Sequence, residues 1–184
     1  MHASVVSFQD SSYMFSGLSG SGKSTLAKEI LHLGGKLTTE DVASMKIKEE
    51  VYVEPSFPLL KTEKDINENL IEYRLNGIKG DNRNRYLYRI KDAFFKKERI
   101  EISKIFFLVE RRNKKIEIDP VKEKIEKLKL VYSNIWRQVP YNISTDSEKM
   151  ILDKVSALVN KTEFYKVKLG EDPKENVSFI LKHY

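Results

Sequence analysis

Residues 17–24 constrain the fold of this chain more than any other segment. They read Gly-Leu-Ser-Gly-Ser-Gly-Lys-Ser, which has the form G-x-x-x-x-G-K-[ST] of a phosphate-binding loop. A loop of this kind joins the end of a β-strand to the beginning of an α-helix. The sequence therefore predicts a strand that ends near residue 16 and a helix that begins near residue 25.

The segments on both sides agree with this expectation. Residues 12–16 are a short β-prone run, and residues 25–33 carry apolar side chains at helical spacing on one face. Gly34 and Gly35 follow directly, and a glycine pair at this position is typical of the end of a helix. Strand, glycine-rich loop, helix and glycine stop thus occur in the order that a phosphate site requires.

The residue types in the loop point to binding of a magnesium nucleotide. Glycines allow successive backbone N–H groups to face a polyphosphate, Lys23 is expected to reach the β- and γ-phosphates, and Ser24 is expected to ligate Mg²⁺. The expected nucleotide-binding residues are Gly17, Ser19, Gly20, Ser21, Gly22, Lys23, Ser24 and Thr25.

Composition limits the other function classes. The 184 residues fit one domain over 1–184, and the absence of cysteine excludes disulfides and fits a cytoplasmic protein. No apolar run approaches the roughly 20 residues that cross a bilayer, so no membrane partner is expected. The net charge of +6 arises from 33 basic and 27 acidic residues that are interspersed, which disfavours a nucleic-acid partner.

The rest of the chain alternates between strand and helix patterns. Hairpins before and after the first helix favour a mixed sheet covered by helices over a purely parallel sheet. A loop is predicted at 76–85, and the run at 104–110 is expected to be a strand buried on both faces. The other expected strands cover 4–8, 13–16, 36–39, 43–48, 51–54, 85–90, 115–119 and 163–169, and the other expected helices cover 62–75, 120–135, 147–159 and 174–182.

Several segments together resemble a known family. They are His2-x-Ser4-x-Val6, the loop with its preceding Met-Phe-Ser, Leu-Gly-Gly-Lys-Leu-Thr-Thr-Glu-Asp at 33–41, and Val-x-Pro-x-x-Pro-x-Leu at 53–60. The pattern resembles the HPr kinase/phosphorylase family, and more closely its shorter members, which include kinases of precursor peptides. It covers roughly residues 2 to 61 and continues loosely at 105–110 and 165–169. The resemblance implies a mixed-sheet α/β P-loop kinase domain of the type shared with phosphoenolpyruvate carboxykinase.

The resemblance also implies roles for three residues. Asp41 takes the place of the catalytic carboxylate, which accepts the proton of a serine hydroxyl. Glu40 stands beside it where the family commonly has a second aspartate, and it is expected either to hold Mg²⁺ with Ser24 or to be a surface charge. His2 is expected to lie close to Asp41. The implied activity is transfer of a phosphoryl group from ATP to a hydroxyl of a protein or peptide.

The sequence also departs from the family pattern. The glycine-rich Leu-Glu-Ile-Arg-Gly signature is not found downstream of the loop, which disfavours HPr itself as the acceptor and disfavours the reverse, phosphate-removing reaction. The family's members are often oligomeric, so a homo-oligomer is an open expectation.

Two alternatives remain open at this stage. One is a small-molecule kinase similar to adenylylsulfate kinase, although its Asp-Gly-Asp-Asn sequence is not found after the first helix. The other is a regulatory module that binds nucleotide without transferring phosphate. Arg83, Arg85 and Arg89 are candidate transition-state cations, and Glu110 is either an additional Mg²⁺ ligand or a strand-edge charge.

Overall fold

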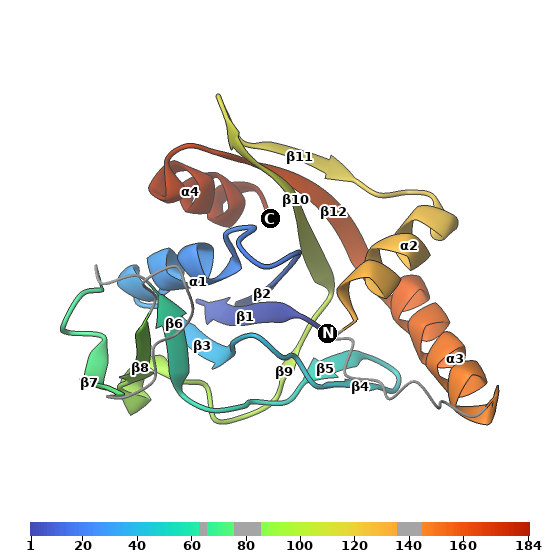
Figure 1. Cartoon of the computed structure of the whole chain (residues 1–184), viewed down its shortest axis with the longest axis horizontal. Coiled ribbons are helices and arrows are strands. Elements are labelled where there is room, and N and C mark those ends of the chain that lie inside the picture. The colour runs from blue at the N-terminus through green and yellow to red at the C-terminus, as the bar shows by residue number, and fades with distance from the viewer. Residues whose placement is uncertain (63–65, 76–85, 136–144) are drawn as a thin grey trace.

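The computed structural model describes residues 1–62, 66–75, 86–135 and 145–184. Its centre is a six-stranded mixed sheet with the strand order β11-β12-β10-β2-β1-β3 (Figure 1). Strand β10 runs parallel to both of its neighbours, and the other pairs are antiparallel. The strands of this sheet are β1 (Ala3–Phe8), β2 (Ser11–Ser16), β3 (Lys36–Thr39), β10 (Lys104–Asn113), β11 (Glu117–Pro120) and β12 (Glu163–Gly170).

Helices cover both faces of the central sheet (Figure 1). Helices α1 (Lys23–His32) and α4 (Pro173–His183) pack on one face, where Phe15, Phe106 and Val167 are buried. Helices α2 (Lys124–Asn134) and α3 (Thr145–Lys161) pack on the other face, together with a small sheet. Two apolar cores result, one on each side of the sheet, as alternating side chains of the same strands point in opposite directions.

Strand β10 shows this arrangement most clearly. Ile105 and Phe107 belong to the core of α2 and α3, whereas Phe106 and Leu108 belong to the core of α1 and α4. All four side chains are at most 4% exposed. The prediction of a strand buried on both faces is therefore confirmed for these four residues, which need no polar alternation. Val109 and Glu110, at the end of the predicted run, are exposed.

Two small sheets complete the described structure. The first has the order β4-β5-β9, and the second has the order β6-β8-β7. Helix α1 contacts β6 of the second sheet, so this sheet lies beside the helix that follows the loop. These strands are β4 (Met45–Ile47), β5 (Val51–Val53), β6 (Leu59–Thr62), β7 (Ile71–Arg74), β8 (Tyr86–Ile90) and β9 (Ile100–Glu101), and a short 3-10 helix covers Asp92–Phe94.

The predicted β1–β2 hairpin and the mixed sheet are confirmed, but the predicted helix at 62–75 is wrong. Thr62 ends strand β6, and Ile71 begins strand β7, which pairs with β8. Between them Asn67 forms a local turn, because its Oδ1 accepts a hydrogen bond from Asn69 N at 2.9 Å and its carbonyl accepts one from Leu70 N. This use of an asparagine side chain competes with helix formation.

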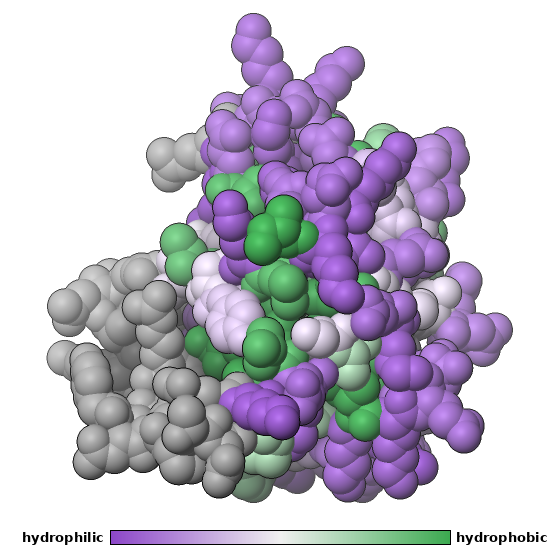
Figure 2. Space-filling view, turned by 90° about the vertical axis from the view of Figure 1, so that its right-hand side faces the viewer, coloured by the Kyte–Doolittle hydropathy of each residue, from purple (hydrophilic) through white to green (hydrophobic). Residues whose placement is uncertain are grey.

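One face of the molecule carries α2 and α3. Figure 2 shows that hydrophilic side chains cover most of the coloured part of this face and that apolar ones gather near its centre. On these two helices the large exposed apolar side chains of the described residues are Ile125, Tyr132, Met150 and Leu152. None of the helices in the described part of the chain has the length and apolar character needed to cross a bilayer. The expected homo-oligomer stays a prediction.

Candidate functional site

The loop between β2 and α1 has the backbone that its glycines allow. Gly17, Gly20 and Gly22 have positive φ angles of 152°, 86° and 108°, which other residues rarely adopt. A methyl group on Gly17 would lie 2.8 Å from the carbonyl oxygen of Leu108 on β10. The loop is therefore pressed against the continuation of β10 beyond its pairing with β2.

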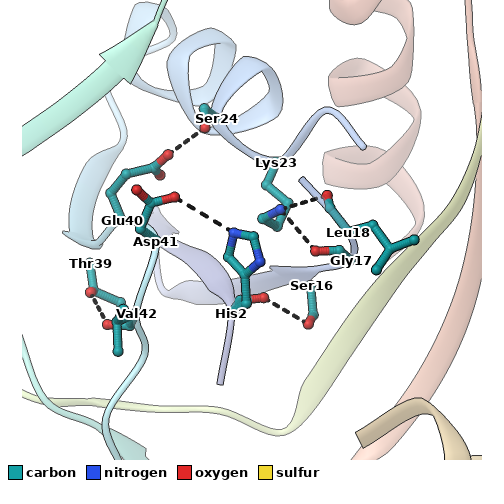
Figure 3. A network of polar contacts seen from close by, with 10 residues as sticks. All are labelled: His2, Ser16, Gly17, Leu18, Lys23, Ser24, Thr39, Glu40, Asp41 and Val42. Atoms are coloured by element: carbon teal, nitrogen blue, oxygen red, sulfur yellow. Dashed lines mark hydrogen bonds and ion pairs between the residues drawn. The ribbon is translucent and has the colours of Figure 1, made fainter. Parts of the chain in front are cut away.

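Lys23 is the first residue of α1, and its side chain turns back over the loop. Its Nζ donates hydrogen bonds to the carbonyl oxygens of Gly17, at 2.9 Å, and Leu18, at 3.0 Å (Figure 3). Only 5% of the residue is exposed. The ammonium is thus held at the place where a polyphosphate would approach the backbone N–H groups at the beginning of the helix.

Ser24 and Glu40 connect α1 with the end of β3. The Ser24 hydroxyl donates a short hydrogen bond to Oε1 of Glu40 (Figure 3). The second oxygen, Oε2, is buried and has no hydrogen-bond partner among the described residues. Burial raises the pKa of Glu40 to about 7, although the hydrogen bond from Ser24 acts in the opposite direction.

This oxygen pair fits a magnesium ion. Mg²⁺ usually takes one or two protein oxygens and completes its shell with phosphate oxygens and water. Ser24 Oγ and the buried Oε2 of Glu40 provide two such oxygens beside the loop. Within the described residues no three His, Asp or Glu side chains form a preassembled metal site, so these two oxygens would bind the ion together with the nucleotide.

Asp41 occupies a strained turn. Its φ is +65°, and Val42 N donates a hydrogen bond to the carbonyl of Glu40 at 2.8 Å. A three-residue turn with a positive central φ is the rarer form of the γ-turn. The Thr39 hydroxyl stabilises the turn by donating to the carbonyl of Val42 at 2.7 Å. Strain held in this way is common at functional sites because it fixes the direction of a side chain.

His2 lies against the carboxylate of Asp41. Its Nε2 is 3.6 Å from Oδ1 of Asp41, and the two residues lie side by side because the first residues of the chain pair with the segment after β3 (Figure 3). The contact with His2 is the main cause that lowers the pKa of Asp41, and the charges of Lys61 and Lys23 lower it further. The carboxylate is therefore ionised at neutral pH.

These side chains surround a cavity of about 600 Å³. Four basic side chains line it, from α1, β6 and β10, whereas Asp41 is the acidic residue among its described lining. Such a charge excess suits a polyanion. The lining residues are His2, Ser19, Gly20, Gly22, Lys23, Ser24, Thr25, Lys28, Asp41, Val42, Lys61, Thr62, Arg111 and Pro173.

The structure places the expected residues unequally. Most of the expected nucleotide-binding residues line the cavity, but Gly17 and Ser21 are not part of its described lining. Glu110 is exposed outside the lining, at the register position of Lys168. Arg89 lies outside it as well and binds Glu72 and Asp92. The two further candidate cations, Arg83 and Arg85, fall outside the described residues.

Three cavity cations were not predicted from the sequence. Lys28 follows Lys23 on α1, Lys61 is on β6, and Arg111 is on β10. Arg111 Nη1 donates a hydrogen bond to the carbonyl of Gly20 at 2.7 Å, which holds this side chain against the loop. Lys28 could have been found from helical spacing, but no sequence pattern relates Lys61 or Arg111 to the loop.

Comparison with known proteins gives a fold relationship. The sequence matches no protein-family model and no curated protein sequence. The structure is similar to that of the Hpr(Ser) kinase/phosphatase from Coxiella burnetii, with a TM-score of 0.50 and 14% sequence identity. The match covers 100% of this chain and 94% of that chain. The chain is thus a mixed α/β protein, with a mixed central sheet, whose fold is similar to that of an HPr kinase.

Proposed function

We propose that this protein is an ATP- and Mg²⁺-dependent kinase that transfers the γ-phosphoryl group to a hydroxyl, with serine in a protein or peptide as the expected acceptor. One observation carries the proposal. The carboxylate of Asp41 shares a cavity with Lys23 and with the glycine-rich loop, so a candidate base faces a candidate phosphate site. The fold likeness to an HPr(Ser) kinase/phosphatase supports the same reaction class.

In this proposal the loop binds the triphosphate. Lys23 would exchange its hydrogen bonds with the carbonyls of Gly17 and Leu18 for contacts with phosphate oxygens, and the N–H groups at the beginning of α1 would donate to the same group. Ser24 and Glu40 would hold Mg²⁺, which neutralises developing charge on the phosphates when it is bound. Their role is to fix the γ-phosphoryl group with respect to Asp41.

Asp41 would orient the acceptor hydroxyl and accept its proton. Phosphoryl transfer passes through a loose transition state, so positioning of the hydroxyl matters more than its early deprotonation. A carboxylate whose pKa is lowered by His2 is ready to accept a hydrogen bond at neutral pH. The γ-turn and the contact with His2 would keep the carboxylate directed into the cavity.

Transfer from labelled ATP tests this function. The protein is incubated with serine-containing peptides and, separately, with small hydroxyl acceptors. Asp41→Asn should lower transfer about 100-fold or more while nucleotide binding persists. Lys23→Ala should instead abolish nucleotide binding, and Asp153→Asn, on the exposed side of α3, serves as the matched control.

Each outcome separates the candidates. Loss of transfer in Asp41→Asn with nucleotide binding retained supports the kinase and its base. Transfer confined to small molecules would replace the protein or peptide acceptor, and nucleotide binding without transfer to any acceptor would indicate a regulatory module. Full transfer by Asp41→Asn would require a different base.

A further inference from the structure

The cavity carries more positive charge than the phosphate loop supplies. Lys23 belongs to the loop, whereas Lys28, Lys61 and Arg111 come from other parts of the fold. A magnesium nucleotide neutralises part of its own charge through the metal. Cations outside the loop therefore indicate either further phosphate contacts or a second anionic group in the same cavity.

Arg111 lies on the nucleotide side of the cavity. Its guanidinium donates to the carbonyl of Gly20, and its Nε lies 3.7 Å from the position that a methyl group on Gly22 would take. Both contacts are with the loop that is expected to surround the phosphates. We therefore expect Arg111 to contact the nucleotide and not the acceptor.

Lys61 lies on the side of the candidate base. It belongs to β6, which is in a different sheet from β2, the strand that leads into the loop. Within its own sheet Lys61 pairs with Leu87 of β8. Lys61 and Asp41 both line this cavity, so one ligand in it can contact both side chains. Among the described residues no ion-pair partner of Lys61 is found, and its side chain is partly exposed to the cavity.

The orientation of Asp41 does not account for this lysine. His2 already fixes Asp41, so Lys61 is not needed to orient it. An anionic group of the acceptor, bound next to the reacting hydroxyl, would explain why Lys61 lines the cavity.

We propose that the acceptor is an acidic peptide segment, in which an aspartate or glutamate close to the phosphorylated serine binds Lys61. This inference rests on the proposed kinase function and names the substrate class of the same cavity. The acidic side chain would pair with Lys61 while the serine hydroxyl reaches Asp41 and the loop holds the nucleotide. Charge complementarity of this kind contributes to specificity and to the rate of association.

Peptide binding tests the inference separately from catalysis. Three fluorescent peptides share one central serine and carry Asp, Asn or Lys at the flanking positions. Their affinities are measured by fluorescence anisotropy with the phosphate loop saturated by a magnesium complex of a non-hydrolysable ATP analogue, so that an acidic peptide cannot occupy the loop. The variants are Lys61→Glu and, as the matched control, Lys122→Glu, which replaces an exposed lysine outside the cavity.

The wild-type protein should bind the acidic peptide about tenfold or more tightly than the neutral one. Lys61→Glu should weaken binding of the acidic peptide by about tenfold and strengthen binding of the basic one, because reversal of one charge in a close pair exchanges attraction for repulsion. Lys122→Glu should leave the preference unchanged. Analogue affinity should stay within about twofold in every variant.

Contrary results are equally clear. Equal binding of the three peptides, or an unchanged preference in Lys61→Glu, would overturn the inference even if the protein phosphorylates serine. So would a loss of analogue affinity in Lys61→Glu, since Lys61 would then act on the nucleotide. Binding of the acidic peptide through Lys61 without any transfer from ATP would instead remove the proposed kinase function and leave an acidic-ligand site.

Discussion

Among single residues, two glycines with positive φ differ in what a side chain would meet. A methyl group on Gly17 would lie 2.8 Å from a backbone oxygen of β10, whereas the space around Gly34 is open to 4 Å. Gly34→Ala should thus lower the free energy of unfolding by about 1 kcal/mol, because only backbone strain is added. Gly17→Ala should cost about 3 kcal/mol or more, because the β10 backbone must also shift. Urea denaturation of both variants measures the difference, and equal losses would contradict it.

Glu40 should make the stability of the ligand-free protein depend on pH. Its folded-state pKa of about 7 is raised, so the buried carboxyl is favourable in its protonated form. The related stability is present at pH values below the ordinary pKa of glutamate and is lost as the pH rises through about 7. Glu40→Gln stays neutral and should be more stable than the wild type by about 2 kcal/mol at pH 8, with a smaller difference at pH 5.

Thermal or urea unfolding in EDTA at the two pH values measures this effect. EDTA is required because a bound metal ion would itself favour the ionised carboxylate. Glu171→Gln, at an exposed position before α4, is the matched control. If the difference in stability between Glu40→Gln and the wild type does not grow with pH, ionisation of the buried carboxyl does not destabilise the protein, and the prediction is wrong.

At the scale of elements, α4 depends on its first residues. Oδ1 of Asp172 accepts a hydrogen bond from Lys174 N at 2.8 Å, and Pro173 occupies the first turn. Asp172→Ala should lower the free energy of unfolding by about 1 kcal/mol, since one helix N–H then loses its partner. Glu171→Ala, one residue earlier and exposed, should change it by less than about 0.5 kcal/mol. Similar losses in both variants would mean that the cap does not stabilise the helix.

The elements around the loop could be predicted because their signals are local. The strand at 36–39 agrees with the structure residue for residue, and Gly34 with its φ of 92° follows α1 as expected. The segment 62–75 could not be read in this way. Its apolar spacing suits a helix, but pairing of β6 and β7 with β8 and the turn at Asn67 determine its structure. Tertiary pairing of this kind leaves no periodic mark in a short segment.

The same distinction applies to the candidate site. The motif indicates the loop, and the resemblance over residues 2 to 61 indicates Asp41, because both lie in one short part of the sequence. Lys61 and Arg111 reach the cavity only because β6 packs beside α1 and because β10 continues past the end of β2. Both depend on register and packing, which the chain does not encode in a motif.

At the scale of the whole molecule, the cavity joins parts of the fold that are otherwise separate. Its lining includes residues from the beginning of the chain, α1, the turn after β3, strand β6 of a second sheet, β10 and α4. A ligand that contacts several of these parts binds the folded chain and not the unfolded chain. It must therefore stabilise the entire protein by mass action.

A magnesium nucleotide should accordingly raise the melting temperature. At 100 times its dissociation constant a ligand adds about 2.7 kcal/mol, which corresponds to a shift of roughly 5 to 10 °C for a chain of this size. The shift should increase with nucleotide concentration, vanish in Lys23→Ala and persist in Lys122→Ala, since Lys122 is exposed outside the cavity. Persistence of the full shift in Lys23→Ala would place the nucleotide elsewhere on the molecule, because the loop without its ammonium loses the charge that faces the phosphates.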